Sequence, residues 1–135
     1  MSVVIDASAT LPWYFQDEAS PESELIFDRV ASVGATVPGH WKLEAANGFQ
    51  TALRRRRIDP DYRDESLADL DSLPIDIDPE TNARAWLDTI QIASRFGLTP
   101  YDAAYLELAL RRHLPLATLD KDLRRAASDA GVELV

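Results

Sequence analysis

Short apolar runs alternate with longer amphipathic stretches along most of the chain. The runs predict buried strands at residues 3–5, 35–37, 74–78, 114–118 and 132–135. The stretches between them predict helices at residues 11–16, 22–33, 40–57, 59–72, 79–96, 99–113 and 121–130. Strands that alternate with helices need crossover connections, which favour a mainly parallel sheet covered on both faces. We therefore predict an α/β fold, a three-layer α/β/α sandwich.

Turn and cap residues set several of these boundaries. Ser20 and Pro21 are a typical cap and first-turn proline for the second helix, and Gly34 is expected to end it. In the same way, Gly97 is expected to end the helix at 79–96, and Thr99 with Pro100 to start the next one.

Length and composition narrow the class of protein. The 135 residues are 46% hydrophobic, which is enough for one ordinary core, so we expect a single domain over residues 1–135. There is no signal-peptide pattern and no apolar run near the ~18 residues of a membrane span, which predicts a soluble cytoplasmic protein without membrane contact. Because the chain has no cysteine, any metal must be bound by oxygen ligands or by His40 and His113.

The formal net charge of −9 argues against a general nucleic-acid binder, which usually carries a basic face. The positive charges are nevertheless concentrated. Arg54–Arg57 form one basic block, and a second one lies around residues 111–125. The first block could bind RNA phosphates or could simply complement a helix end, and an acidic surface could also favour a basic protein partner.

Four acids stand at positions where the fold could gather them. Asp6 and Asp120 each end an apolar run, and ligands of parallel sheets bind outside the carboxyl ends of the strands. Glu44 lies early in one predicted helix with Asn47 on the same face, and Asp102 lies in the first turn of another. Together they would form a carboxylate pocket.

Three of the four acids also have a purely structural interpretation. Asp102 could complement the helix dipole, and Asp120 could serve only as the cap of the helix that follows. Asp122 is open to the same capping role, or is a fifth, outer acid. A helical glutamate such as Glu44 is usually solvated, although Leu43, Ala45, Ala46 and Phe49 leave little polar surface around it. Gathered carboxylates without a basic neighbour repel one another, and a hard cation such as Mg²⁺ or Mn²⁺ relieves that repulsion. Such a metal supports phosphodiester hydrolysis.

Four segments of the chain resemble the PIN-domain ribonucleases, and among them the VapC-type toxins of bacterial toxin-antitoxin pairs. The segments are Val3–Ser8, Glu44–Asn47, Leu98–Ala109 and Leu116–Leu123, in the same order and at suitable spacing. The resemblance implies that Asp6, Glu44, Asp102 and Asp120 are the catalytic, metal-binding acids. It implies supporting roles for Asn47, Thr118 and Ser8, with Asp122 a further candidate.

The same resemblance implies an endoribonuclease toxin that depends on Mg²⁺ or Mn²⁺, cleaves RNA, forms a homodimer and is inhibited by a cognate antitoxin protein. Alternatives are a housekeeping nuclease of the same fold and a non-catalytic scaffold, although the complete quartet argues against the scaffold. A phosphatase of the haloacid-dehalogenase type would need an aspartate where Ser8 stands. Trp13, Tyr14 and Phe15 are expected in the core, with a partner surface as the lesser alternative, and Trp41 and Trp86 in the core or an interface.

Overall fold

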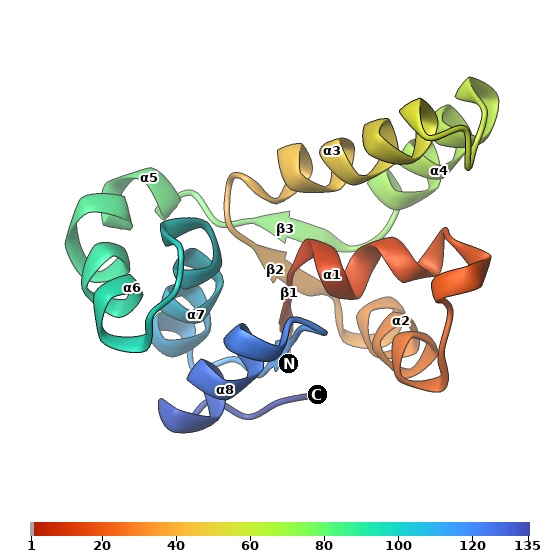
Figure 1. The fold of residues 1–135 in the computed structure, drawn as a ribbon. Coiled ribbons are helices and arrows are strands. Elements are labelled where there is room, and N and C mark those ends of the chain that lie inside the picture. The colour runs from red at the N-terminus through yellow and green to blue at the C-terminus, as the bar shows by residue number, and fades with distance from the viewer. Residues whose placement is uncertain (1) are drawn as a thin grey trace.

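The fold centres on a parallel sheet. The computed structural model describes residues 2–135, and within that range four strands pair in the order β3, β2, β1, β4 (Figure 1). They are β1 (Val3–Ile5), β2 (Ala35–Val37), β3 (Ile75–Ile77) and β4 (Leu116–Ala117). Val4 of the central strand pairs with Thr36 of β2 and with Leu116 of β4. Every residue of β1 is fully buried, as the continuous apolar run predicted.

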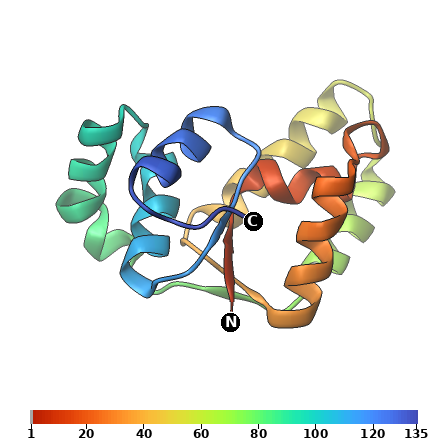
Figure 2. The same ribbon diagram turned by 90° about the horizontal axis from the view of Figure 1, so that it is seen from below.

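Helices cover both faces of this sheet, which confirms the three-layer α/β/α arrangement. Helix α7 packs against β1 on one face, with α6 and α8 packed against α7, and α2 packs against β1 on the other face with α1 and α3 nearby (Figures 1 and 2). The helical segments are α1 (Ala7–Thr10), η1 (Leu11–Trp13), η2 (Gln16–Glu18), α2 (Pro21–Val33), α3 (Trp41–Arg54), α4 (Pro60–Asp71), α5 (Thr81–Arg84), η3 (Ala85–Thr89), α6 (Ile90–Phe96), α7 (Pro100–Arg112) and α8 (Lys121–Asp129).

Most of the predicted helix boundaries are confirmed by local hydrogen bonds. Ser20 and Ser23 form a reciprocal capping box at the start of α2, and Thr99 caps α7 by accepting from the amide of Asp102. At the other ends, Gly34 and Gly97 adopt φ angles of 80° and 66°, which a residue with a side chain rarely adopts. Polar side chains and glycines therefore set these boundaries locally.

Three predicted elements differ from the structure. The helix expected at 11–16 begins earlier, at Ala7, because the carboxylate of Asp6 caps it by accepting from the amide of Ala9, and the segment continues as a 3₁₀ turn. The strand expected at 132–135 is reduced to one bridge between Leu116 and Leu134. The helix expected at 79–96 is broken into α5, a π-helical segment and α6, with non-helical angles at Leu87 (φ −110°, ψ −107°).

The basic block after α3 also departs from the prediction. The helix ends at Arg54 rather than at Arg57, and Arg56 has a φ of 58°. Arg57 binds the carboxylates of Asp17 and Glu18 at 2.9 Å and its guanidinium lies 4.8 Å from the ring centre of Phe15. These contacts draw the chain away from the helix axis, so only Arg54 of the block lies in the last turn of α3.

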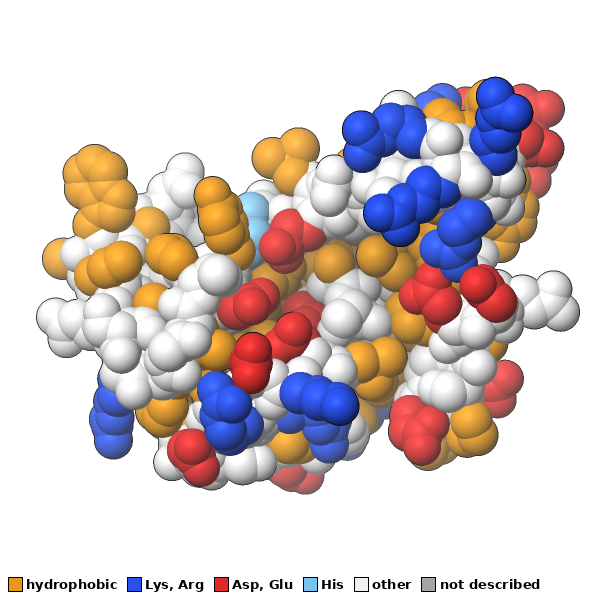
Figure 3. Space-filling model, viewed as in Figure 1, with side chains coloured by type: hydrophobic (Ala, Val, Ile, Leu, Met, Phe, Trp, Pro, Cys, Tyr) orange, Lys and Arg blue, Asp and Glu red, His pale blue; other side chains and the backbone are white. Residues whose placement is uncertain are grey.

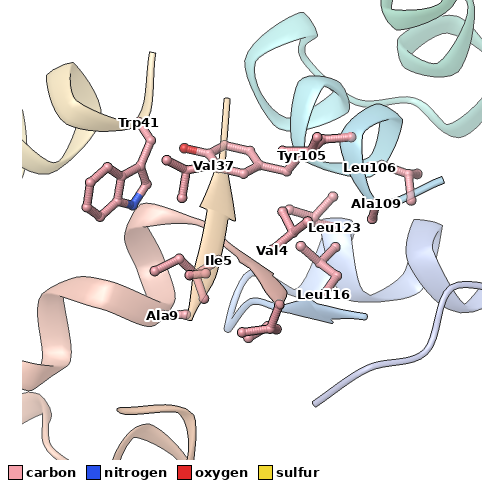
Figure 4. Close-up of a cluster of buried hydrophobic side chains, with 14 of the residues drawn as sticks. Val4, Ile5, Ala9, Val37, Trp41, Tyr105, Leu106, Ala109, Leu116 and Leu123 are labelled. Atoms are coloured by element: carbon pink, nitrogen blue, oxygen red, sulfur yellow. The ribbon is translucent and has the colours of Figure 1, made fainter. Parts of the chain in front are cut away.

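The largest buried side chains fill the space between the sheet and its helices. Tyr105 of α7 extends toward Val37 of β2, and Trp41 of α3 lies on the other side of Val37 (Figure 4). Burying one such side chain stabilises the fold by about 1.5–3 kcal/mol. The core role of Trp41 is thereby confirmed.

The other aromatic residues divide between core and surface. Phe15 is buried against Phe49, and Trp13 packs edge-on against Phe27, so the cluster at 13–15 packs as core. Trp86, by contrast, is 91% exposed, so the core alternative for this residue is wrong.

Over residues 2–135, no helix combines the length and the apolar character that crossing a bilayer requires.

Candidate active site

The four predicted acids are brought to the same rim of the sheet. Asp6 directly follows β1, and Asp120 follows β4, the strand that pairs with β1 in parallel. Glu44 and Asp102 come from the first turns of α3 and α7. Acidic side chains gather in a hollow near the centre of the face shown in Figure 3. The negative charges of Asp120 and Glu44 act on Asp102, and Asp102 in turn acts on Asp6.

Asp6 is the most deeply placed of these acids. Its side chain is held by hydroxyls and a backbone amide: Ser8 Oγ donates to Oδ1 at 2.7 Å, the Ala9 amide to Oδ1 at 3.0 Å, and Thr118 Oγ1 to Oδ2 at 2.5 Å. The residue is only 4% exposed. Burial raises the pKa of Asp6 from 3.8 to about 6, with the charge of Asp102 adding to the rise and the three hydrogen bonds opposing it.

Asp102 is half-buried, and its side chain is not used to cap its helix. Thr99 takes that part, because its hydroxyl accepts from the amide of Asp102 at 3.2 Å. Burial raises the pKa of Asp102, and the nearby charges of Asp120 and Glu44 raise it further. Within the described chain, no hydrogen bond reaches the carboxylate oxygens of Asp102, so they remain available.

Glu44 is positioned by a contact that the sequence did not suggest. The hydroxyl of Tyr105, on α7, donates to Glu44 Oε1, and His40 Nε2 lies 3.6 Å from the same oxygen. The expected apolar surroundings are wrong in part, because Leu43 is 75% exposed and Ala46 is also exposed. What separates Glu44 from an ordinary solvated glutamate is therefore its hydrogen bond to the buried Tyr105 hydroxyl, not the residues around it on α3.

Asp120 combines both interpretations that the sequence left open. Its Oδ1 accepts from the amide of Leu123 at 2.9 Å and so caps α8, while its own amide donates to Thr118 Oγ1 at 3.1 Å. A carboxylate has a second oxygen, and no hydrogen bond within residues 2–135 occupies Oδ2. Capping the helix thus leaves one oxygen of Asp120 free.

The supporting residues divide into two pairs. Ser8 and Thr118 both contact Asp6, and their hydroxyl oxygens lie 3.3 Å apart, so they are brought into the site. Asp122 instead pairs with Arg125 at 3.1 Å on the surface. Asn47 is exposed, and no hydrogen bond from its side chain is found within residues 2–135. Within residues 2–135, neither Asp122 nor Asn47 forms a hydrogen bond or ion pair with the four acids.

Arginine and lysine side chains form no ion pair with any of the four acids in the part of the chain described. The contrast is Asp78, which follows β3 and is 2% exposed. It binds Arg111 at 2.6 Å and Arg112 at 2.8 Å. Burial acts to raise the pKa of Asp78, but hydrogen bonds and charge from Arg111 outweigh it and lower the pKa overall. Asp78 is thus neutralised, whereas the four acids keep their mutual repulsion.

The set of ligand atoms fits a hard divalent cation, because carboxylate oxygens are the ligands that Mg²⁺ and Mn²⁺ prefer. The spacing is more open than that of a preformed site: across residues 2–135, no three Asp, Glu or His side chains are close enough together to hold a metal ion as they stand. Asp102 is half-buried and its carboxylate has no hydrogen bond within residues 2–135, so this side chain is the freest of the four to rotate. A cation would therefore have to draw the acids together.

Two contributors to this rim were missed at the level of sequence. Tyr105 lies three residues after Asp102, so the two share one helical face, which is the signal that could have identified it. His40, considered in the sequence as a possible metal ligand, directly precedes α3. Its ring also contacts the Tyr101 carbonyl at 3.0 Å and lies edge-on to the Tyr105 ring.

Comparisons with known proteins agree with this fold. The family model described as "PIN domain" matches residues 3–129. Ribonuclease VapC3 from Pyrobaculum aerophilum is 28% identical over 123 residues, which cover 91% of this chain and 92% of the relative. Among solved structures, PAE2754 from Pyrobaculum aerophilum aligns with a TM-score of 0.65 at 21% identity, covering 93% of this chain and 84% of the other. VapC20 from Mycobacterium tuberculosis, described as a sarcin-ricin loop cleaving toxin, aligns with a TM-score of 0.66 at 15% identity, covering 99% and 98%. At these identities the two structures establish the fold alone.

Proposed function

The chain belongs to the PIN domain family, and we propose that it is a VapC-type endoribonuclease toxin that hydrolyses RNA phosphodiester bonds with Mg²⁺ or Mn²⁺. The observation that carries this proposal is the convergence of Asp6, Glu44, Asp102 and Asp120 on one rim, where no lysine or arginine of residues 2–135 forms an ion pair with them. The names of two similar proteins support it, since VapC3 is called a ribonuclease and VapC20 a toxin that cleaves the sarcin-ricin loop.

The four acids would hold the cation, and each has an oxygen that can serve. A bound Mg²⁺ or Mn²⁺ lowers the pKa of its water and stabilises negative charge on a phosphate. Ser8 and Thr118 hold the Asp6 carboxylate in place, so its position is fixed before any ligand arrives. Burial raises the pKa of Asp6 to about 6, and a positive charge bound at this rim would favour its ionised, metal-binding form.

Part of the basic block supports an RNA substrate. Arg57 is engaged by Asp17 and Glu18, whereas Arg54, Arg55 and Arg56 are exposed. Basic side chains lie over the end of α3 on the same face as the acidic hollow (Figure 3). We infer that these three arginines contact RNA phosphates to one side of the cleaved bond, which offsets the net charge of −9 locally.

The proposal includes a cognate antitoxin protein and a homodimer, both acting in the cytoplasm where the RNA is found. The net negative charge supports a basic protein partner. Exposed apolar side chains around the π-helical segment, Trp86 (91%) and Leu87 (60%), support a protein contact on that side. Separate surfaces are thus suited to RNA and to proteins.

The metal mechanism is tested with purified protein and a labelled RNA. We expect cleavage in Mg²⁺ or Mn²⁺ and none in excess EDTA, because the four carboxylates alone supply no positive charge to the phosphate. Full activity in EDTA would contradict the mechanism.

The toxin assignment is tested in cells. Induced expression should arrest growth, co-expression with the adjacent small gene product should restore it, and Asp102→Asn should be harmless. A wild-type chain that is harmless without any partner would favour a housekeeping nuclease or a scaffold.

A further inference from the structure

Tyr105 is a buried polar side chain whose position is not explained by packing alone. It is fully buried on α7, yet its hydroxyl is a strong donor and acceptor that needs a partner in such a place. That partner is Glu44 Oε1, a residue 61 positions away on α3. The contact therefore joins two of the helices that carry the acids.

The phenol lies at the base of the acidic cluster. Burial raises the pKa of Tyr105, the hydrogen bond to Glu44 raises it further, and the charges of Asp6 and Asp102 add to the rise. The hydroxyl is thus a neutral donor within electrostatic reach of three acids. The hydroxyl donates a hydrogen bond at this rim without carrying a positive charge. A lysine or arginine in its place would repel a bound cation.

Without such a contact, Glu44 would be a mobile side chain. Its side chain is 32% exposed and has three rotatable bonds, which cost conformational entropy to fix. Tyr105 binds one oxygen, Oε1, and no hydrogen bond within residues 2–135 reaches the other, Oε2. One oxygen is held and one is left available.

We propose that Tyr105 is the positioning residue of the cation site: its hydroxyl holds Glu44 through one oxygen and leaves the other for a divalent cation. The inference rests on the proposed function and adds to it a residue that acts through Glu44. Partners that orient metal ligands in this way usually contribute about 10- to 100-fold to metal affinity.

The variant Tyr105→Phe removes the hydroxyl and keeps the ring in the core. We expect Mn²⁺ affinity, measured by calorimetry, to fall on the order of tenfold. The midpoint of thermal unfolding in EDTA should change by no more than about 5 °C, since the released Glu44 oxygen can be hydrated. Tyr14→Phe is the matched control, because the Tyr14 hydroxyl also donates to a carboxylate, that of Asp69 at 2.7 Å, away from the site. This control should bind Mn²⁺ as the wild type does.

A double-mutant cycle separates positioning from general support of the fold. In a Glu44→Gln background, Tyr105→Phe should have no further effect on Mn²⁺ affinity, because the ligand that it positions is already lost. An equal loss in both backgrounds, or unchanged affinity in Tyr105→Phe, would overturn the inference while leaving the proposed function standing. A wild-type protein that binds no Mn²⁺ would overturn both.

Discussion

Asp6 should make the metal-free protein less stable as pH rises, and Asp6→Asn should remove that loss. Burial raises the folded-state pKa of Asp6 from 3.8 to about 6. Below pH 3.8 the carboxyl is protonated in both states and its contribution to stability is fully present. Between pH 3.8 and 6 the unfolded chain ionises first, so unfolding releases a proton and rising pH favours the unfolded state. Above pH 6 the loss is complete.

The size of this effect follows from the shift. From 3.8 to about 6 is roughly two pKa units, and each unit is worth 1.36 kcal/mol, so the loss is about 3 kcal/mol at pH 8. Asp6 is only 4% exposed, so solvent screens this effect little. Asparagine keeps an acceptor for the amide of Ala9 and cannot ionise. In EDTA, the variant should therefore be the more stable protein at neutral pH.

The assay is urea unfolding of wild type and Asp6→Asn at pH values from 4 to 8, in EDTA. The difference in unfolding free energy should be small at pH 4, grow by about 1.4 kcal/mol per pH unit up to pH 6, and then level off. Adding Mg²⁺ should restore stability to the wild type only. A difference that does not change with pH would refute the argument that burial of Asp6 opposes folding.

Further substitutions test other parts of the structure. Arg111→Met should destabilise the fold by about 3–5 kcal/mol, because it leaves Asp78 buried without its main partner. Because Arg111 lowers the pKa of Asp78, the variant should also lose less unfolding free energy than the wild type when the pH is lowered. In urea unfolding, Phe49→Ala should cost about 3–5 kcal/mol through loss of a fully buried ring. Asp120→Asn should abolish RNA cleavage but keep the cap of α8, whereas Asp59→Asn, which changes an exposed cap of α4, should cleave RNA at the wild-type rate.

The sequence predicted β1, β2 and β4 well because these strands are buried, whereas the edge strand β3 is largely exposed. A run such as Val3–Ile5 has few alternatives once helices flank it, and polar caps such as Ser20 and Thr99 mark where the helices start. The break around Leu87 could not be predicted in this way. The segment holds no proline or glycine that would mark a break, and its Trp86 and Leu87 side chains remain largely exposed in the structure.

The same distinction applies to the site. Asp6 and Asp120 follow from strand ends, since adjacent parallel strands bring their carboxyl ends together. The link from Tyr105 to Glu44 joins residues 61 positions apart, and only the packing of α7 against the sheet reveals it. Likewise, no local pattern indicates that Arg111 and Arg112 enclose Asp78. Long-range pairing of charges is what local patterns leave open.

The most direct test of the account is whether the four acids act as one cation site. Crystals soaked in Mn²⁺ should show an anomalous scattering peak bonded to carboxylate oxygens of Asp6, Glu44, Asp102 and Asp120, at about 2.2 Å as expected for an oxygen-ligated cation of this size. The side chain of Asp102 should have moved toward it, and Glu44 should keep its hydrogen bond to Tyr105. A peak elsewhere on the protein, with no Mn²⁺ among these four residues, would contradict the central claim.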